Sequence, residues 1–248
     1  MLPYILLSLA AFTSGVLNAV AGGGAFITFP ALLFAGVPPV GANATSTVAL
    51  FPGQMASAWA YRQDIGGVRE VSVVAFVALS LIGGLIGALL LLFTSNAVFA
   101  RLVPWLLLFA TLVFAAGNFM GKGVAAGRVR LGHRGVLVTQ FLISIYGGYF
   151  GGGIGFLMLA ALTLFGMRDI HAMNGLKILL ATLMNGAAVI AFALAGIVHW
   201  PETLAMAAAS VVGGYVGALG AKRVDQRVIK GCVIALGAAL TVYFFWRG

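Results

Sequence analysis

Acidic residues are scarce in this sequence. Only 5 of its 248 residues are Asp or Glu, against 14 Lys and Arg residues. All five lie at or near the ends of apolar segments, at Asp64, Glu70, Asp169, Glu202 and Asp225. Because no acid falls in the middle of an apolar run, the pattern argues against a carboxylate proton relay or a sodium site inside a membrane. It also argues against the paired carboxylates that hydrolytic enzymes use.

Cysteine and histidine are also rare. The single cysteine, Cys232, excludes a disulfide within the chain. The three histidines lie at segment ends, and no spacing of His, Cys and carboxylate is typical of a metal site. No Ser, His and Asp set points to nucleophilic catalysis. We therefore predict that the protein is not an enzyme and needs no metal or cofactor.

The sequence is rich in long apolar runs. Hydrophobic residues make up 62% of the chain, and the mean hydropathy is +1.12. Apolar runs of about 20 residues are typical of transmembrane helices. We predict an all-α, polytopic membrane protein with ten segments, namely Pro3–Val20, Ala25–Ala35, Thr45–Tyr61, Val71–Phe93, Ala97–Gly117, Val136–Phe150, Ile154–Phe165, Leu176–Ala195, Thr203–Leu219 and Val228–Trp246. The second is too short to cross about 30 Å of hydrocarbon, and Pro30 inside it predicts a break.

The two halves of the chain share landmarks at a nearly constant spacing. Gly83, Gly84, Gly87 and Ala88 recur 130 positions later as Gly213, Gly214, Gly217 and Ala218. The triplet Gly22–Gly24 matches Gly151–Gly153 at a spacing of 129, and Asn43 matches Asn174 at 131. Repeats of this kind are typical of transporter folds. We predict a first repeat at residues 1–117, a basic linker at 118–134 and a second repeat at 135–248, all within one membrane domain.

Basic residues alternate between connections, which predicts how the repeats are oriented. They gather in four connections, at Arg62 and Arg69, at Lys122, Arg128, Arg130 and Arg134, at Arg168, and at Lys222, Arg223, Arg227 and Lys230. The connections Gly36–Ala42 and Thr94–Asn96 carry no Lys or Arg, nor does Gly196–Glu202. By the positive-inside rule, the basic connections and the linker face the cytoplasm and both termini lie outside. Five segments in each half then predict a 5+5 inverted repeat. If the two short segments re-enter instead of spanning, the later connections keep their sides.

The glycine clusters and a lysine are the first candidates for a binding site. Gly22, Gly23 and Gly24, with Gly151, Gly152 and Gly153, predict broken helices whose N–H groups face an anion at mid-membrane. Close helix packing or a plain hinge is the alternative. For the glycines at 83–87 and 213–217, packing is the favoured interpretation. Lys177 lies about one turn into an apolar segment, where it provides a positive charge for an anion or extends to the cytoplasmic face.

Polar side chains also follow the third segment and its counterpart. The candidates for substrate binding are Asn43, Thr45 and Ser46 in the first half and Asn174 and Asn185 in the second. Thr47, Gln54 and Thr182 lie on the same polar faces, and Asn18, Gln140 and Ser144 precede the glycine clusters as weaker candidates. These groups either coordinate an oxyanion or hold neighbouring helices together.

Two stretches of the chain resemble a known family. The stretch NAVAGGGAFITFPALLFAGVPPVGANATS and the pair GGYFGGGIGFLMLAALTLFG and MNGLKILLATLMNG are similar to the signature stretches of the sulfite exporter TauE/SafE family, also called the sulfonate uptake permease family. The resemblance covers essentially the full chain. It places Gly22–Gly24, Asn43, Gly151–Gly153, Asn174 and Lys177 in the signature stretches. One departure is that Lys177 has hydroxyl residues, Ser46 and Thr47, as its counterpart.

The resemblance implies a carrier in the cytoplasmic membrane of a bacterium or archaeon. Its substrates would be small sulfur-containing anions such as sulfite, thiosulfate, sulfoacetate or another organosulfonate, moved by alternating access. An anion channel on the same scaffold is the alternative. The expected partners are the anion and the lipid bilayer, and nucleic acid is not expected because the basic residues sit in short connections. The direction of transport, the coupling ion and the oligomeric state stay open, with a homodimer among the alternatives.

Overall fold

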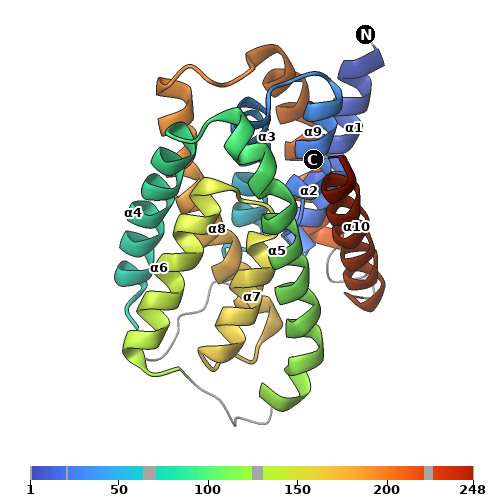
Figure 1. Ribbon diagram of the computed structural model, residues 1–248. Helices are drawn as coiled ribbons and strands as arrows, with labels where there is room; N and C mark the ends of the chain where they lie inside the picture. Colours follow the sequence, from blue (N-terminus) through green and yellow to red (C-terminus); the bar gives the residue numbers. More distant parts are fainter. Residues whose placement is uncertain (1, 21, 64–70, 125–130, 221–225, 248) are drawn as a thin grey trace.

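The computed structural model describes residues 2–20, 22–63, 71–124, 131–220 and 226–247. Within these ranges the chain forms α-helices and no strand, which confirms the all-α prediction (Figure 1). The helices are α1 (Leu2–Val20), α2 (Ala25–Phe34), α3 (Pro39–Ala60), α4 (Val73–Leu92), α5 (Asn96–Val124), α6 (His133–Tyr149), α7 (Ile154–Leu164), α8 (Ile170–Leu194), α9 (Trp200–Gly220) and α10 (Gln226–Arg247).

Several predicted features lie outside the described part of the chain. These are the acids Asp64, Glu70 and Asp225 and the basic residues Arg69, Arg128, Arg130, Lys222 and Arg223, together with the side chains of Lys122, Arg227, Lys230 and Cys232. The predicted linker at 118–134 overlaps the end of α5, because this helix continues to Val124.

Five of the described helices are long and apolar enough to cross a membrane. They are α1, α4, α5, α8 and α9, and each holds a window of high mean hydropathy over at least 18 residues. By contrast, α2 and α7 have only 10 and 11 residues. At 1.5 Å per residue they measure about 15–17 Å, roughly half of the hydrocarbon thickness. The chain is therefore a multi-pass membrane protein that contains two half-length helices.

The helix breaks fall at the glycine clusters. Between α1 and α2 the described residues 22–24 are not helical, and neither are residues 151–153 between α6 and α7. The expectation of a break at Pro30 is wrong, because α2 runs through this residue. Pro52 and Pro104 likewise lie inside α3 and α5. A proline removes one N–H donor, whereas Gly22, Gly151 and Gly153 at these breaks adopt a positive φ that other residues rarely reach.

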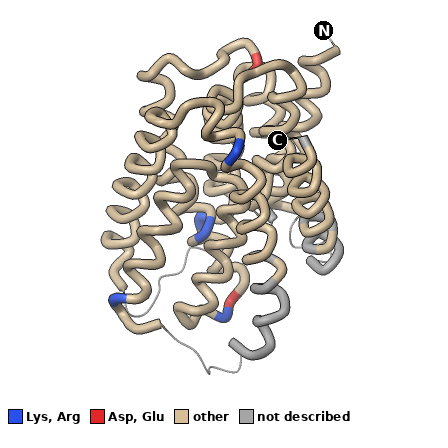
Figure 2. The backbone as a smooth tube through the Cα atoms, in the orientation of Figure 1, with Lys and Arg blue, Asp and Glu red and all other residues tan. Residues whose placement is uncertain are grey.

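The connections without Lys or Arg come together at one end of the molecule. Val40 N–H at the start of α3 donates to Asn96 Oδ1 at the start of α5 over 2.9 Å, and His199 N–H, just before α9, donates to Thr45 Oγ1 over 3.0 Å. At the other end, Leu131 N–H donates to Leu164 O over 3.2 Å and so joins the start of α6 to the end of α7. Arg134 and Arg168 are exposed at that second end. Figure 2 shows the same separation of the connections.

Helix packing follows matching pairs in the two halves. α1 packs along α9 as α6 packs along α4, and α3 contacts α9 as α8 contacts α4. The pairs α3 with α8 and α5 with α10 join counterparts directly. This pattern is compatible with a two-fold relation between residues before and after the linker.

The glycines of α4 and α9 serve close packing, as predicted. A Cβ added at Gly84 would lie 2.5 Å from Met184 O of α8, and one added at Gly214 would overlap Gly53 O of α3. Met184 and Gly53 are themselves 131 positions apart. The equivalent glycines Gly84 and Gly214 therefore allow the equivalent helices α8 and α3 to approach closely.

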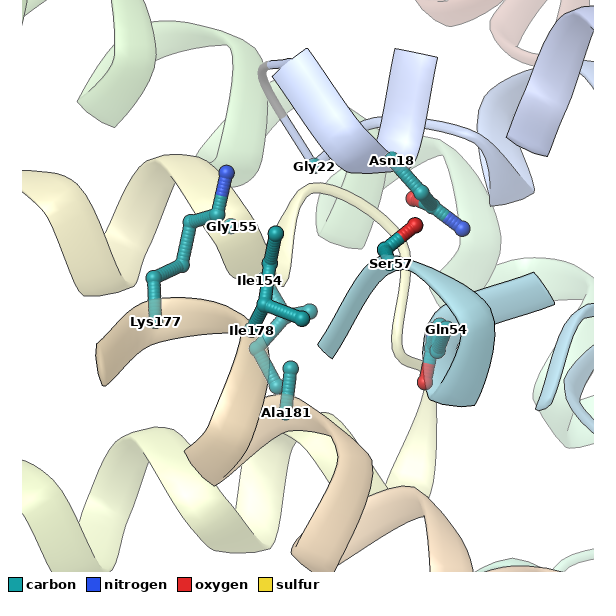
Figure 3. A pocket seen from close by; sticks show the side chains of 9 residues that line it. All are labelled: Asn18, Gly22, Gln54, Ser57, Ile154, Gly155, Lys177, Ile178 and Ala181. Atoms are coloured by element: carbon teal, nitrogen blue, oxygen red, sulfur yellow. The ribbon is translucent and has the colours of Figure 1, made fainter. Parts of the chain in front are cut away.

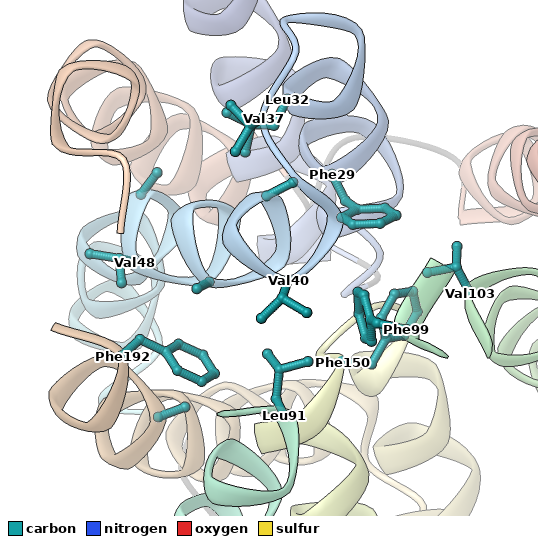
Figure 4. Packing of buried hydrophobic residues seen from close by; sticks show 14 of the residues in the cluster. Phe29, Leu32, Val37, Val40, Val48, Leu91, Phe99, Val103, Phe150 and Phe192 are labelled. Atoms are coloured by element: carbon teal, nitrogen blue, oxygen red, sulfur yellow. The ribbon is translucent and has the colours of Figure 1, made fainter. Parts of the chain in front are cut away.

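An aromatic cluster fixes the second break against the first. Phe29 of α2 packs edge-on against Phe99 of α5 and Phe150, with ring centroids 6.1 Å and 6.0 Å apart. Phe150 directly precedes the glycines at 151–153, and its side chain is buried. Figure 4 shows these rings in a core that also includes residues of α3, α4 and α8. Burial of such rings stabilises a single arrangement of the two breaks.

Candidate functional site

The two helix breaks meet inside the molecule. Gly155 N–H, in the first turn of α7, donates to Gly22 O over 3.2 Å. Gly22 has a φ of +84°, and a Cβ added there would overlap Gly155 Cα. Gly153, with a φ of +73°, directly precedes α7. Glycine is therefore required for both conformation and close approach, and it brings the starts of α2 and α7 together.

Polar side chains hold the backbone at these breaks. Asn18 Oδ1 accepts a hydrogen bond from Gly24 N–H over 2.8 Å, and Ser14 Oγ donates to Gly24 O over 2.7 Å. In the second half, Tyr146 OH donates to Gly152 O over 2.8 Å. Non-helical backbone at membrane depth needs such partners, because lipid offers none.

A pocket lies beside the meeting point (Figure 3). Its lining combines polar and apolar side chains. The lining residues are Asn18, Gly22, Gln54, Ser57, Ile154, Gly155, Lys177, Ile178 and Ala181. Most of these side chains are buried, and Asn18 and Gln54 are half-buried. The pocket is thus closed in by α1, α3, α7 and α8.

Lys177 is the charged group of this pocket. Its side chain is 1% exposed, and Nζ donates to Asn174 Oδ1 over 3.0 Å, one turn earlier on α8. The lysine therefore does not extend to the membrane surface, the alternative that the sequence left open. Among the described residues, the carboxylates of Asp169 and Glu202 lie at helix ends and none is buried.

The electrostatics of the pocket favour an anion. A helix N-terminus carries a partial positive charge, and α2 and α7 both begin beside the pocket. When protonated, the amine of Lys177 adds a full charge, and its hydrogen-bond partner among the described residues is the neutral Asn174 Oδ1. A buried cation without a counter-ion is costly, so a bound anion would relieve this cost.

Most of the predicted site residues lie at or beside the pocket, and three lie elsewhere. Gly22 and Lys177 line the pocket, and Asn174 and Asn185 contact residues that line it. Gly23, Gly24, Gly151, Gly152 and Gly153 form the two breaks beside it. Asn43, Thr45 and Ser46 lie elsewhere in α3: Asn43 donates to Tyr149 O, Thr45 accepts from His199 N–H and Ser46 bonds Thr28. In this structure, these last three side chains hold helices together.

Besides Asn18, a weaker candidate, two polar pocket residues were not selected from the sequence as candidates of the first rank. Gln54 Oε1 accepts a hydrogen bond from Asn185 Nδ2 over 2.9 Å, and the two residues are 131 positions apart. This is the same spacing as that of Asn43 and Asn174, so it could have identified Gln54. Ser57 Oγ donates to Gly53 O or Gly214 O, and nothing in its sequence context distinguishes it from an ordinary helical serine.

Comparison with known proteins supplies the family. The model of the family described as "Sulfite exporter TauE/SafE" matches residues 7–244. A "Probable membrane transporter protein" of Haemophilus influenzae is 30% identical over 232 residues, which cover 93% of this chain and 89% of that protein. A relative from Sinorhizobium sp., "Probable membrane transporter protein ORF9", is 31% identical over 95% of this chain and 90% of its own length. "Probable membrane transporter protein YfcA" of Escherichia coli K12 is 27% identical over 93% and 85%.

Because the family model and these relatives match nearly the whole length of the chain, the chain belongs to the TauE/SafE sulfite exporter family of membrane transporters.

Proposed function

We propose that this transporter is a secondary carrier of a small sulfur-containing anion in the cytoplasmic membrane of a bacterium or archaeon. The candidates are sulfite, thiosulfate, sulfoacetate and other organosulfonates. The observation that carries the proposal is the buried ammonium of Lys177, which has no buried carboxylate among the described residues and lies in a pocket where two helix N-termini meet. Such a site suits an oxyanion.

The anion would bind by exchanging its hydration for groups of the pocket. Lys177 would provide charge-assisted hydrogen bonds, which are shorter and stronger than neutral ones. The helix N-termini at Ala25 and Ile154 would add favourable dipoles. Ile154, Ile178 and Ala181 form an apolar wall that a sulfonate with a short hydrocarbon chain would contact. Nothing in this arrangement requires a chemical change of the substrate.

The arrangement of the repeats supports alternating access as the mechanism. We propose that residues 1–117 and 135–248 form inverted repeats on either side of the cytoplasmic linker at 118–134. Their helices pack in matching pairs, and the pocket lies where the two breaks meet. A relative movement of the halves would open the pocket to one side of the membrane at a time.

A channel on the same scaffold is the second candidate. A channel requires a continuous polar path, whereas Lys177 and Ile178 are almost fully buried and Phe29, Phe99 and Phe150 form a packed core between helices next to the breaks. Closed packing of this kind favours a carrier, in which the site is exposed only after a conformational change.

Flux into liposomes tests the proposal. Purified protein is reconstituted, and uptake of radiolabelled sulfite, thiosulfate, sulfoacetate and methanesulfonate is measured with chloride and phosphate as comparison anions. A carrier gives saturable uptake of at least one sulfur anion and accelerated exchange when the same anion is inside. Flux that does not saturate, accompanied by single-channel currents, would support the channel. Absence of flux and binding for all the sulfur anions would refute the proposed substrate class.

A further inference from the structure

Asn18, one of the weaker candidates from the sequence, lines the pocket in the structure. The residue lies near the C-terminal end of α1, half-buried, and lines the pocket together with Lys177 of α8. Figure 3 shows the two side chains on different walls of the pocket. The pocket therefore has polar groups from both halves of the chain.

The orientation of the Asn18 amide follows from its backbone partner. Gly24 N–H is a donor and nothing else, so the atom of Asn18 that lies 2.8 Å away must be the carbonyl oxygen Oδ1. The NH₂ group, Nδ2, lies beside Gly24, where an added Cβ would be 2.8 Å from it. Among the described residues, Nδ2 has no hydrogen-bond acceptor, whereas Oδ1 has its donor. The arrangement leaves two N–H donors of Asn18 free at the pocket wall.

We infer that Asn18 is a substrate-binding residue whose Nδ2 donates to an oxygen of the bound anion while its Oδ1 holds Gly24 of the first break. This inference rests on the proposed function, since it takes the same oxyanion as ligand. Lys177 binds the anion from the second half, and Asn18 binds it from the first. The anion thereby joins the two halves, and the amide of Asn18 transmits its presence to the backbone at Gly24.

The alternative is that Asn18 only satisfies Gly24 N–H. An aspartate distinguishes the two roles, because it has nearly the same shape and accepts the same hydrogen bond. A carboxylate next to the N-terminus of α2 is also favourable for the helix. If Asn18 only holds the break, Asn18→Asp is tolerated. If Nδ2 contacts the anion, Asn18→Asp replaces two donors with a negative oxygen that repels it.

Asn96 offers a matched control elsewhere in the molecule. Its Oδ1 accepts from Val40 N–H over 2.9 Å, so it holds the start of a helix in the same way, but it does not line the pocket. Asn96→Asp and Asn96→Ala therefore reproduce the change of charge and the loss of the hydrogen bond without touching the proposed site.

The test measures the dissociation constants of sulfite, thiosulfate and methanesulfonate for the full-length protein, and the thermal midpoint of each variant. We expect Asn18→Asp to keep the midpoint within about 2 °C and to weaken binding about tenfold or more, the loss typical of a hydrogen bond to a charged group. Asn96→Asp should leave the dissociation constants unchanged. Asn18→Asp that binds with wild-type affinity would overturn the inference.

A second pair of variants decides the question if Asn18→Asp does not yield folded protein. Asn18→Ala removes both bonds without adding charge, and we expect it to weaken anion binding more than threefold, roughly the lower limit for a lost hydrogen bond. Asn96→Ala should lower the thermal midpoint without this effect. Equal affinities of Asn18→Ala and the wild type would refute the inference alone. If the wild type binds none of the three anions, the proposed function fails and this inference fails with it.

Discussion

At the scale of single residues, Lys177 dominates the account. Its side chain is 1% exposed and bonds the neutral amide of Asn174, and no Asp or Glu in the described part of the chain is buried. Burial of a charge is unfavourable for the fold. A residue that costs stability at such a place is retained for a function, and attraction of an anion is the function that the surroundings support.

Substitution of this lysine should separate binding from stability. Lys177→Met keeps the length of the side chain and removes the charge, so we expect about tenfold or greater loss of affinity for thiosulfate. The thermal midpoint should stay the same or rise, because the uncompensated charge is gone. Titration calorimetry and thermal unfolding in detergent measure the two effects. Unchanged binding and uptake in Lys177→Met would remove Lys177 from the site.

The sequence predicted some of these residues more readily than others. A lysine within an apolar run is conspicuous, and the triple glycines recur at a fixed spacing, so Lys177 and Gly22 were found. Asn43, Thr45 and Ser46 looked equally suitable, but they are bonded to other helices. Periodicity shows which side of a helix is polar, and it does not show which neighbouring helix lies there. Ser57 gave no signal at all.

At the scale of helices, the breaks at the glycine clusters create the site. α2 and α7 are half-length helices, and Gly155 in the first turn of α7 contacts Gly22, which lies in the break before α2. The triplets predicted these breaks, whereas the break expected at Pro30 does not occur. A proline inside a helix costs one hydrogen bond and is tolerated when the packing around it is favourable, and Pro30 is buried.

Two glycine variants separate the effect of the close contact between the breaks on stability from the effect of backbone strain. Gly22→Ala should be destabilised by the positive φ, at about 1–2 kcal/mol, and by overlap with Gly155, at about 1–3 kcal/mol more. Gly36 has a φ of +90° with no atom within 4 Å of an added Cβ, so Gly36→Ala should show only the first effect. Thermal unfolding measures the stability of Gly22→Ala and Gly36→Ala relative to the wild type. Equal destabilisation of the two variants would show that the close approach is unimportant.

Close packing of the long helices gives a second comparison of the same kind. We expect Gly84→Ala to lose about 1–3 kcal/mol of stability, because its Cβ would lie 2.5 Å from Met184 O. Gly231 lies in α10 with open space around an added Cβ, so Gly231→Ala should be neutral or stabilising by about 0.5–1 kcal/mol. Denaturation in mild detergent measures both. A Gly84→Ala protein as stable as Gly231→Ala would argue against the packing role.

At the scale of the whole molecule, the two halves have matching contacts. The pairs of α1 with α9 and α6 with α4 follow the spacing of about 130 residues seen in the sequence, and Gln54 and Asn185 bond each other as counterparts. The fold class, the number of described helices and the repeated glycines could be predicted, because apolar length and spacing are properties of the chain itself. The end of α5 could not, since its helix continues past the last apolar residues to Val124.

The orientation in the membrane is a prediction at this scale. In a background with Cys232→Ala, we expect an impermeant maleimide to label Ala195→Cys from outside intact cells and to leave Gly132→Cys unlabelled. Both positions are exposed at helix ends. Arg101, exposed near the uncharged end, is an exception to the charge pattern and does not reverse it. Labelling of Gly132→Cys with no labelling of Ala195→Cys would invert the proposed topology.

The central claim is that an oxyanion binds between the two helix breaks beside Lys177. A cryo-electron microscopy structure of the full-length protein with selenite, a heavier analogue of sulfite, tests it most directly. The account predicts density for the anion within hydrogen-bond distance of Lys177 Nζ, next to Gly22 and Gly155. Density at a different place, or an empty pocket at a selenite concentration that saturates binding, would contradict it.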